Sequence, residues 1–343
     1  MVKEGIIRLS LLAGLIALLN GLYNATLYQQ DLEENSPEYV KILKTRDSTD
    51  LYYFGESSNI TYAPDDSIKS SISELTQQKL GSYRITNINK YATHLGMYKE
   101  WMKHVRSDNN NGPIGIILTL NLRSFDAAWI HSKLETPLRE SLVMMEPWPN
   151  MINRFLLSLQ AFDNKTETQR EQDMLNDWSM TPLGLPYPFK YRTVREWDDA
   201  MAAGGHLQAD GTWNTPKIEL SCHYIKAYAF TIRESNPRIR DLDEIQSWCS
   251  QNNVKLFLNL MAENVEYADS LVGKDLVFLM KRNRDYLIRR YQNSNCVVID
   301  NLECVKGKDF IDQNWTTEHY TFNGRNRIAE NLSQAIKENL KRK

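Results

Sequence analysis

The stretch 50-DLYYFGESSN-59 joins a short run of strand-forming aromatic residues to a turn that contains two serines. Aromatic residues favour β-strands, and the small polar residues from Gly55 onward end the run. Most strands that stop in this way continue into an ordinary loop. A serine at this point has a chemical role only if the chain also supplies a base and oxyanion donors, because a serine hydroxyl alone is a weak nucleophile.

Strand and helix patterns alternate on both sides of this stretch. This alternation predicts a parallel sheet with helical crossovers, in which functional side chains gather at the carboxyl ends of the strands. Ser57 would lie at such an end. Strand-like runs occur at 50–55, 83–89, 114–121, 254–260 and 296–302, and helical periodicity occurs at 67–80, 97–107, 241–253, 274–292 and 324–340.

The alternation is interrupted from about residue 125 to about residue 228, where Pro, Gly and Trp are frequent. We interpret this segment as a long irregular insertion within one sheet-forming domain that spans residues 28–343. Its tryptophans could stack on sugar rings, although core packing accounts for most tryptophans in proteins. They are Trp129, Trp148, Trp178, Trp197 and Trp213.

The N-terminus carries an apolar stretch from Ile6 to Leu27, which meets the about 20 residues that a membrane-spanning helix needs. Lys3 and Arg8 stand at its front, and acidic residues follow it. Because positive charge is retained in the cytoplasm, residues 1–27 are predicted to be an uncleaved single-pass anchor with a cytoplasmic N-terminus. The domain that follows would then be extracytoplasmic, in the periplasm or at the cell surface. The alternative is a buried amphipathic helix.

Composition excludes several other functions. The formal net charge is −2 and the pI is near 6.3, so nucleic acid is not an expected partner. The four cysteines have no C-x-x-C spacing, which argues against a zinc or thioredoxin-like site, and both disulfides and free thiols remain open. No glycine-rich loop suited to phosphate is present, so neither a metal nor a nucleotide cofactor is predicted.

Four motifs, taken in order, resemble those of the SGNH, or GDSL-type, hydrolases. They are FGESSN after the first strand, YATHLGMYKEW after the second, LTLNLRSF after the third, and NWTTEHYTFNGRNRIAENL before the last helix. The resemblance implies a flavodoxin-like α/β/α sandwich that acts on esters and acyl groups. Each motif alone is weak, and their order carries the resemblance.

The resemblance also implies roles for individual residues. Ser57 matches the nucleophile, with Ser58 as its rival, and Glu56 stands where the family usually has Asp. His319 matches the general base, because a histidine followed by a short polar loop and an amphipathic helix resembles the last family motif. Ser57 would attack an acyl carbonyl, and His319 would take and return the proton.

The oxyanion donors and the acid follow from the same comparison. The N–H groups of Ser57 and Gly96 and the side-chain amide of Asn121 match the donors. The family expects an acid three residues before the histidine, where this chain has Thr316. Asp312 is the preferred substitute, Glu318 is the alternative, and a histidine held by a backbone carbonyl is a third possibility.

An N-terminal anchor ahead of such a domain resembles the D-alanyl transfer protein of teichoic acids and the alginate acetylation proteins. By this resemblance the chain is a serine esterase or O-acyltransferase acting on acyl esters, foremost acetyl esters, of envelope carbohydrate. A membrane-bound O-acyltransferase would be its partner. The alternative is a catalytically inactive protein of the same fold that binds glycan or serves as a scaffold, which the threonine at position 316 favours.

Overall fold

The computed structural model describes residues 2–105, 112–206, 208 and 211–340. Its centre is a parallel five-stranded sheet with the strand order β2-β1-β3-β4-β5, so the expected α/β architecture with a flavodoxin-like strand order is confirmed. All five strand-like runs of the sequence form strands. They are β1 Leu51–Gly55, β2 Ile85–Asn89, β3 Gly115–Leu120, β4 Lys255–Leu260 and β5 Cys296–Asp300.

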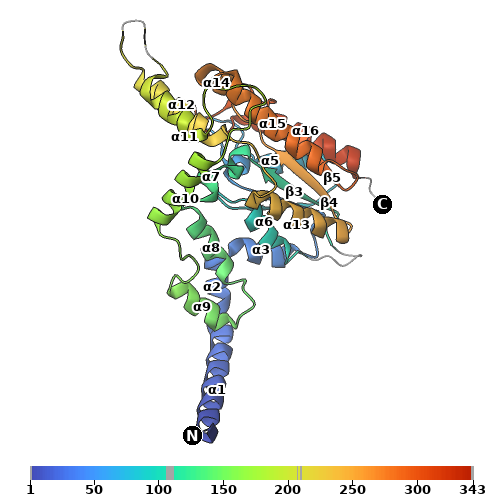
Figure 1. Cartoon of the computed structure of the whole chain (residues 1–343). Helices are drawn as coiled ribbons and strands as arrows, with labels where there is room; N and C mark the ends of the chain where they lie inside the picture. The colour runs from blue at the N-terminus through green and yellow to red at the C-terminus, as the bar shows by residue number, and fades with distance from the viewer. Residues whose placement is uncertain (1, 106–111, 207, 209–210, 341–343) are drawn as a thin grey trace.

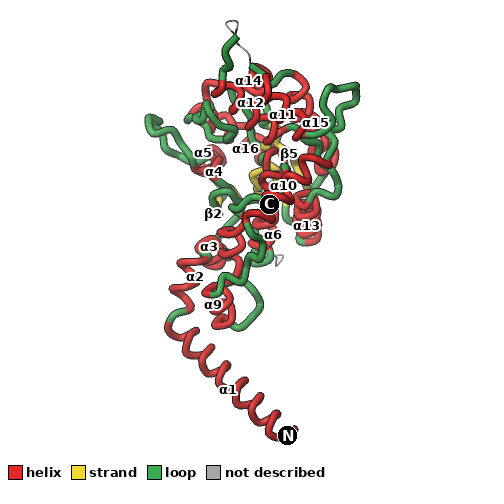
Figure 2. The backbone as a smooth tube through the Cα atoms, turned by 60° about the vertical axis from the view of Figure 1, so that its left-hand side comes forward, coloured by secondary structure: helices red, strands yellow, loops and turns green. Residues whose placement is uncertain are grey.

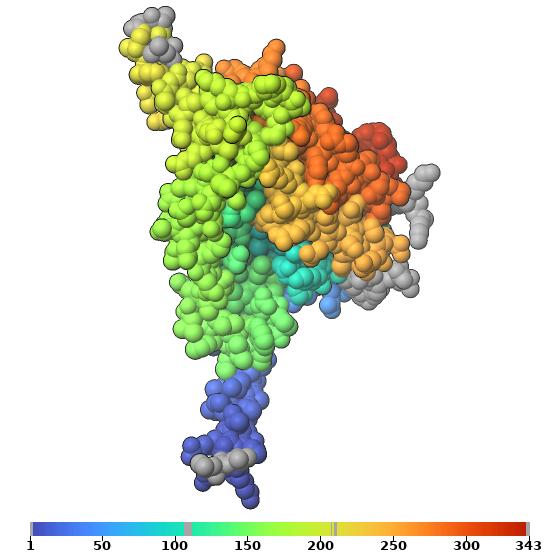
Figure 3. Space-filling model, in the orientation of Figure 1, coloured from blue at the N-terminus to red at the C-terminus, as the bar shows by residue number. Residues whose placement is uncertain are grey.

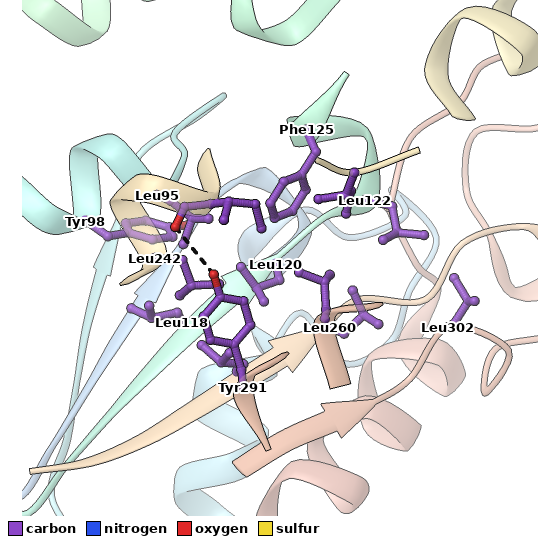
Figure 4. Packing of buried hydrophobic residues seen from close by; sticks show 14 of the residues in the cluster. Leu95, Tyr98, Leu118, Leu120, Leu122, Phe125, Leu242, Leu260, Tyr291 and Leu302 are labelled. Atoms are coloured by element: carbon purple, nitrogen blue, oxygen red, sulfur yellow. Dashed lines mark hydrogen bonds between the residues drawn. The ribbon is translucent and has the colours of Figure 1, made fainter. Parts of the chain in front are cut away.

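Helices cover both faces of the sheet (Figure 1). Alternate residues of β1 divide between two cores, with Tyr52 and Phe54 in one and Leu51 and Tyr53 in the other. The first core includes α6, α13 and α15, and the second includes α5 and α16. Figure 4 shows part of the first core, where leucines of β3 and β4 pack with Leu242 of α13. A strand buried on both faces in this way needs an apolar or aromatic residue at nearly every position.

The expected crossover helices are present. A capping box between Ser71 and Glu74 sets the start of α5. The helix expected at 97–107 begins slightly earlier, and residues 106 and 107 lie outside the described residues. The crossover helices are α5 Ile72–Leu80, α6 Leu95–Met102, α13 Pro237–Gln251, α15 Lys274–Tyr291 and α16 Phe322–Asn339.

The insertion between β3 and α13 is built largely of short helices (Figure 1). Trp178 and Trp197 are buried within it, so these two tryptophans pack in the core. Trp148 and Trp213 are about half exposed. The helices are α7 Ala127–Ile130, α8 Glu135–Val143, α9 Asn150–Ser158, α10 Glu167–Met180, α11 Val194–Gly204 and α12 Thr215–Tyr228.

The N-terminal helix α1 (Val2–Thr26) projects from the body of the molecule (Figures 1 and 2). It is long and apolar enough to cross a membrane, and its apolar part is not buried against the rest of the chain. This exposure argues against a helix buried in the core. The space-filling view shows the same projection, with the insertion beside its upper end (Figure 3).

The remaining elements are short and join the larger ones. Two helices that the sequence pattern did not indicate, α2 and α3, connect α1 to β1. The others lie at the ends of strands, where they shape the loops of the carboxyl edge. These elements are α2 Tyr28–Asn35, α3 Pro37–Thr45, α4 Ser57–Ile60, η1 Leu122–Phe125, α14 Val265–Leu271 and η2 Gly307–Asp309.

Candidate active site

The serine turn follows directly from β1, an interior strand that lies between β2 and β3. Gly55 ends the strand, Glu56 is the N-cap of the short helix α4, and Ser57 is the first residue of that helix. A Cβ atom at Gly55 would collide with Oδ1 of Asn89 and would lie 3.1 Å from Cβ of Asn59. The chain therefore needs glycine at this position, because β2 and the serine turn approach the backbone closely.

The carboxylate of Glu56 organises this turn. It accepts hydrogen bonds from the backbone N–H of Ser58 at 3.1 Å, from the hydroxyl of Ser57 at 3.2 Å and from the side-chain amide of Asn121 at 2.6 Å. Glu56 is only 4% exposed, so these bonds form away from bulk water. Glu56 thus caps the helix and ties the end of β1 to the end of β3.

The two serines of the turn differ in accessibility. Ser58 is fully buried, and its hydroxyl has no hydrogen-bond partner among the described residues. Ser57 is only half-buried, and its hydroxyl donates to Glu56. As the first residue of α4, Ser57 also has a backbone N–H that the helix itself does not use. Accessibility therefore favours Ser57 over Ser58 as a nucleophile.

His319 is paired with Asp312. His319 Nδ1 lies 2.7 Å from Asp312 Oδ2, and the hydroxyl of Thr317 donates to the same oxygen. The other ring nitrogen, Nε2, is buried and has no partner among the residues that the structure describes. Because a carboxylate only accepts hydrogen bonds, Nδ1 carries a proton here, which leaves Nε2 of the neutral ring free to accept one.

A local reversal of the chain brings Asp312 to His319. Phe310 and Tyr320 form an isolated antiparallel bridge, and the backbone N–H of Ile311 donates to the carbonyl of His319 at 2.9 Å. The segment between them forms a closed loop, so an acid seven residues before the histidine can reach its ring. Thr316, which stands where the family has its acid, is buried within this loop.

Asn121 follows β3 directly and is 7% exposed. One of its amide hydrogens is donated to Glu56, and its Oδ1 atom is buried with no partner in the described part of the chain. The amide carries a second hydrogen that this bond does not use. Asn121 therefore lies next to the serine turn, as the matching of motifs predicts, and its role as an oxyanion donor stays a prediction.

Gly96 is the second residue of α6. Its N–H donates to Nδ1 of His94 at 3.1 Å, and a Cβ atom added to it would lie 3.0 Å from Asp241 Oδ2. This N–H is thus engaged in a helix cap, and its role as an oxyanion donor also stays a prediction.

Earlier in the same loop, Lys90 N–H donates to the carbonyl of Gly55 at 3.3 Å, and Ala92 has a positive φ of 58°. A positive φ is uncommon for alanine and marks a locally constrained backbone, which sequence patterns do not reveal.

A buried ion pair lies beside the histidine loop. Glu318 points away from His319 and pairs with Arg123, with 2.6 Å between Oε2 and Nη2. Burial raises the pKa of the Glu318 carboxyl, and the positive charge of Arg123 opposes that rise. Burial alone would lower the pKa of Arg123, but Glu318 and other nearby acidic groups raise it, so the guanidinium remains charged.

Glu263 extends this buried cluster. Its carboxylate accepts hydrogen bonds from the hydroxyl of Tyr228 at 2.6 Å and from the backbone N–H of Leu122 at 3.2 Å. Burial, followed by the nearby charge of Glu318, raises the pKa of Glu263 well above its ordinary value. No sequence motif indicated that Arg123 and Glu263 would form this buried cluster. Their position shortly after the ends of β3 and β4 was the available signal, because the carboxyl edge is where such residues gather.

A further contact joins the serine segment to the histidine segment. Asp66, which follows α4, accepts a hydrogen bond from the N–H of Phe322 at 3.0 Å and pairs with Nη1 of Arg325 at 2.8 Å. The side chain of Arg325 is fully buried and also donates hydrogen bonds to the carbonyl oxygens of Ser70 and Tyr320. The start of α16, just after His319, is thereby fixed against the chain that follows Ser57.

Metal and redox chemistry find little support in the residues. Within the described residues, no group of three or more His, Cys, Asp or Glu side chains could hold a metal ion. All four cysteines are free thiols. Burial raises the pKa of Cys222, Cys296 and Cys304 to about 12, so none of these three is a reactive thiolate at neutral pH.

Comparisons with known proteins give only distant likenesses. No family model matches the chain, and no curated protein matches it. One similar solved structure is a lipase/acylhydrolase from Enterococcus faecalis, with 10% identity, a TM-score of 0.33 and coverage of 86% of this chain and 98% of that one. Another is a protein proposed to be a platelet activating factor, from Streptococcus pneumonia, with 10% identity, a TM-score of 0.35 and coverage of 92% and 99%. Likenesses this distant say nothing of activity, so function is inferred from the site itself.

Proposed function

We propose that this chain is a membrane-anchored, extracytoplasmic serine esterase or O-acyltransferase of the SGNH type. It acts on acyl esters of envelope carbohydrate, foremost acetyl esters, through an acyl-serine intermediate. The observation that carries the proposal is the His319–Asp312 pair, at 2.7 Å, which leaves a buried Nε2 on the base without a partner among the described residues. It accompanies a partly exposed serine at the carboxyl end of the interior strand β1.

In the proposed mechanism, the Ser57 hydroxyl exchanges its bond with Glu56 for one with His319 Nε2, which takes the proton as Oγ attacks the acyl carbonyl carbon. Asp312 holds the ring with Nδ1 protonated and stabilises the imidazolium that forms. The proton then passes to the leaving alcohol, which departs and leaves an ester on Ser57. Water or a sugar hydroxyl next attacks this ester and gives its proton to His319, which passes it to Ser57 Oγ as the acyl–serine bond breaks.

The oxyanion of each tetrahedral intermediate needs donors that face it. The N–H of Ser57 and the second amide hydrogen of Asn121 are the proposed donors on the serine side. Gly96 N–H is the third, and it must exchange its bond with His94 to take part. Glu56 acts as a positioning residue, because it bonds to the serine turn and to Asn121 at once.

The proposed location and substrate rest on the remaining features. Helix α1 has the length and composition of a membrane span, and Lys3 and Arg8 at its start favour a cytoplasmic N-terminus. Trp315, which is about half exposed, lies on the loop between Asp312 and His319 and packs on the ring of His223. An exposed indole there suits the face of a sugar ring. A membrane-bound O-acyltransferase is the proposed acyl supplier if the reaction is transfer.

The test uses the purified full-length protein with p-nitrophenyl acetate, with and without an oligosaccharide acceptor. Release of nitrophenol that is lost in Ser57→Ala supports the serine mechanism. Acetylated oligosaccharide identifies transfer, and acetate alone identifies hydrolysis. Equal rates for the wild type and Ser57→Ala would reject the enzyme in favour of an inactive glycan-binding or scaffold protein. The threonine at position 316 was the feature favouring that alternative, and the contact between Asp312 and His319 weakens it.

A further inference from the structure

Helix α9 of the insertion has two different faces. On one face Leu157 is buried in a small apolar cluster with Tyr23 and Leu32, and the amide of buried Asn153 donates to the carbonyl of Glu146 at 2.9 Å. This face fixes the helix to the body of the protein. The opposite face exposes large apolar side chains, with Phe155 62% exposed and, just after the helix end, Leu159 61% exposed.

Polar contacts hold α9 alongside the C-terminal half of α1 (Figures 1 and 2). The backbone N–H of Met151 donates to Asn20 Oδ1, and the side-chain amide of Asn150 donates to Asn24 Oδ1, both at 3.0 Å. These two asparagines interrupt the apolar sequence of α1 near its end. Their bonds to α9 explain how polar groups are accommodated there, because an unpaired amide in an apolar environment is costly.

An apolar hollow of about 320 Å³ opens between the two helices. Its lining includes Ile16 of α1 and Met151, Ile152 and Phe155 of α9. Ile16 precedes Asn20 by one helical turn, so it belongs to the uninterrupted apolar part of α1. Phe155 therefore lies at the level of residues that are in hydrocarbon if α1 spans a membrane.

We propose that α9 is a membrane-interface helix. Phe155 and Leu159 enter the acyl region of the leaflet where α1 emerges, and Trp148, 58% exposed just before α9, lies at the headgroup level. The occupant of the apolar face is lipid, because this face continues the exposed apolar surface of α1. This inference rests on the proposed membrane anchor. Two attachments in place of one would hold the catalytic domain at a fixed distance and tilt above the membrane.

The test measures lipid contact at single labelled positions in the full chain. Spin labels are placed by Phe155→Cys and Leu159→Cys, whose exposed side chains make no core contact that the label would disturb. The background variant is Cys304→Ser, since the other three cysteines are buried. Leu12→Cys on α1 reports on the anchor, and Asp269→Cys on α14, at the far end of the molecule from α1, is the water-exposed control.

Each protein is reconstituted in vesicles of phosphatidylethanolamine and phosphatidylglycerol. Relaxation of the label by oxygen, which concentrates in lipid, is compared with relaxation by a water-soluble nickel chelate. We expect the labels at 155 and 159 to be more accessible to oxygen than to nickel, at a depth of about 5–10 Å. The label at 269 should show the reverse.

The outcomes separate the inference from the proposal on which it rests. Lipid contact at position 12 with water contact at 155 and 159 overturns the interface helix and leaves the anchor intact. Water contact at position 12 removes the anchor and, with it, the inference. Low accessibility of 155 and 159 to both reagents means that protein covers α9, either a second copy or another membrane protein, and overturns the lipid assignment.

Discussion

Asp312 Oδ2 and His319 Nδ1 lie 2.7 Å apart although the two residues are seven positions apart in the chain. The bridge between Phe310 and Tyr320 closes the loop that contains both residues. Such a pair holds an imidazole in one tautomer and steadies its charged form, which are the two tasks of the acid in a catalytic triad. The first prediction concerns this pair.

Asp312→Asn should lower kcat by about 10⁴-fold, because an amide in place of the carboxylate favours the wrong tautomer of His319. Thr317→Val is the matched control, since it removes only the second donor to the same oxygen and should have a far smaller effect. Steady-state hydrolysis of a soluble ester, with folding checked by circular dichroism, measures both. Near-normal activity of Asp312→Asn would mean that His319 works without this acid.

Glu318→Gln should behave differently from Asp312→Asn. Glu318 is fully buried against Arg123, so the substitution leaves a buried guanidinium without its carboxylate and should lower the free energy of unfolding by about 3–5 kcal/mol. The fraction that remains folded should retain most of its kcat. Urea unfolding and active-site titration separate the two quantities, and a loss of kcat without a loss of stability would transfer the catalytic role to Glu318.

Glu56→Gln tests the residue that replaces the usual aspartate of the family. Its carboxylate accepts three hydrogen bonds, and a glutamine amide cannot accept all of them. We expect a loss of about 1–3 kcal/mol in the free energy of unfolding, together with a lower kcat because Ser57 and Asn121 lose their common partner. Unchanged kcat in a destabilised protein would show that Glu56 is structural only.

The sequence was sufficient to predict the sheet and most of its crossover helices. Runs such as LYYFG and GIILTL are long enough and apolar enough to indicate strands buried on both faces, and all five expected strands are present. The insertion was harder, because its helices range from 4 to 14 residues and stretches rich in Pro and Gly interrupt the periodicity between them. Helix α2 was missed because its sequence is largely polar, and helix α3 because it is only nine residues long.

Contacts between distant segments could not be predicted from one sequence. The pairing of Arg123 with Glu318 spans almost two hundred residues, and nothing local to either residue indicates it. Gly96 has no side chain that could indicate a chemical role, so its role was inferred from its motif alone. In the structure its N–H donates to His94 in a helix cap. The sequence alone does not show that Asp312 contacts His319, because the loop closure that brings them together depends on tertiary structure.

The pH dependence of stability should carry a contribution from Glu135, which contacts His94 at the start of α6. Burial alone would raise the pKa of Glu135, but contacts with His94 and Arg238 lower it from 4.5 to about 2. A depressed pKa stabilises the fold above the ordinary value, and this stabilisation is lost as the pH falls from 4.5 through about 2.

Urea unfolding at a series of pH values measures this contribution. The wild type should lose stability steeply between pH 4.5 and about 2, and Glu135→Gln should lose less across that range because its side chain does not titrate. Glu140→Gln, on the same helix α8, is the control and should keep the wild-type slope. Equal slopes for Glu135→Gln and the wild type would contradict the assignment.

The most direct test of the central claim is intact-protein mass spectrometry after treatment with a fluorophosphonate, which reacts with activated serines. Peptide mapping should place a single adduct on Ser57, with Ser58→Ala labelled normally and Ser57→Ala and His319→Ala unlabelled. This pattern follows because Ser57 is accessible and Ser58 is buried, and because a serine without its base keeps its proton at neutral pH. An adduct on any other residue, or none on the folded wild type, would contradict the serine mechanism.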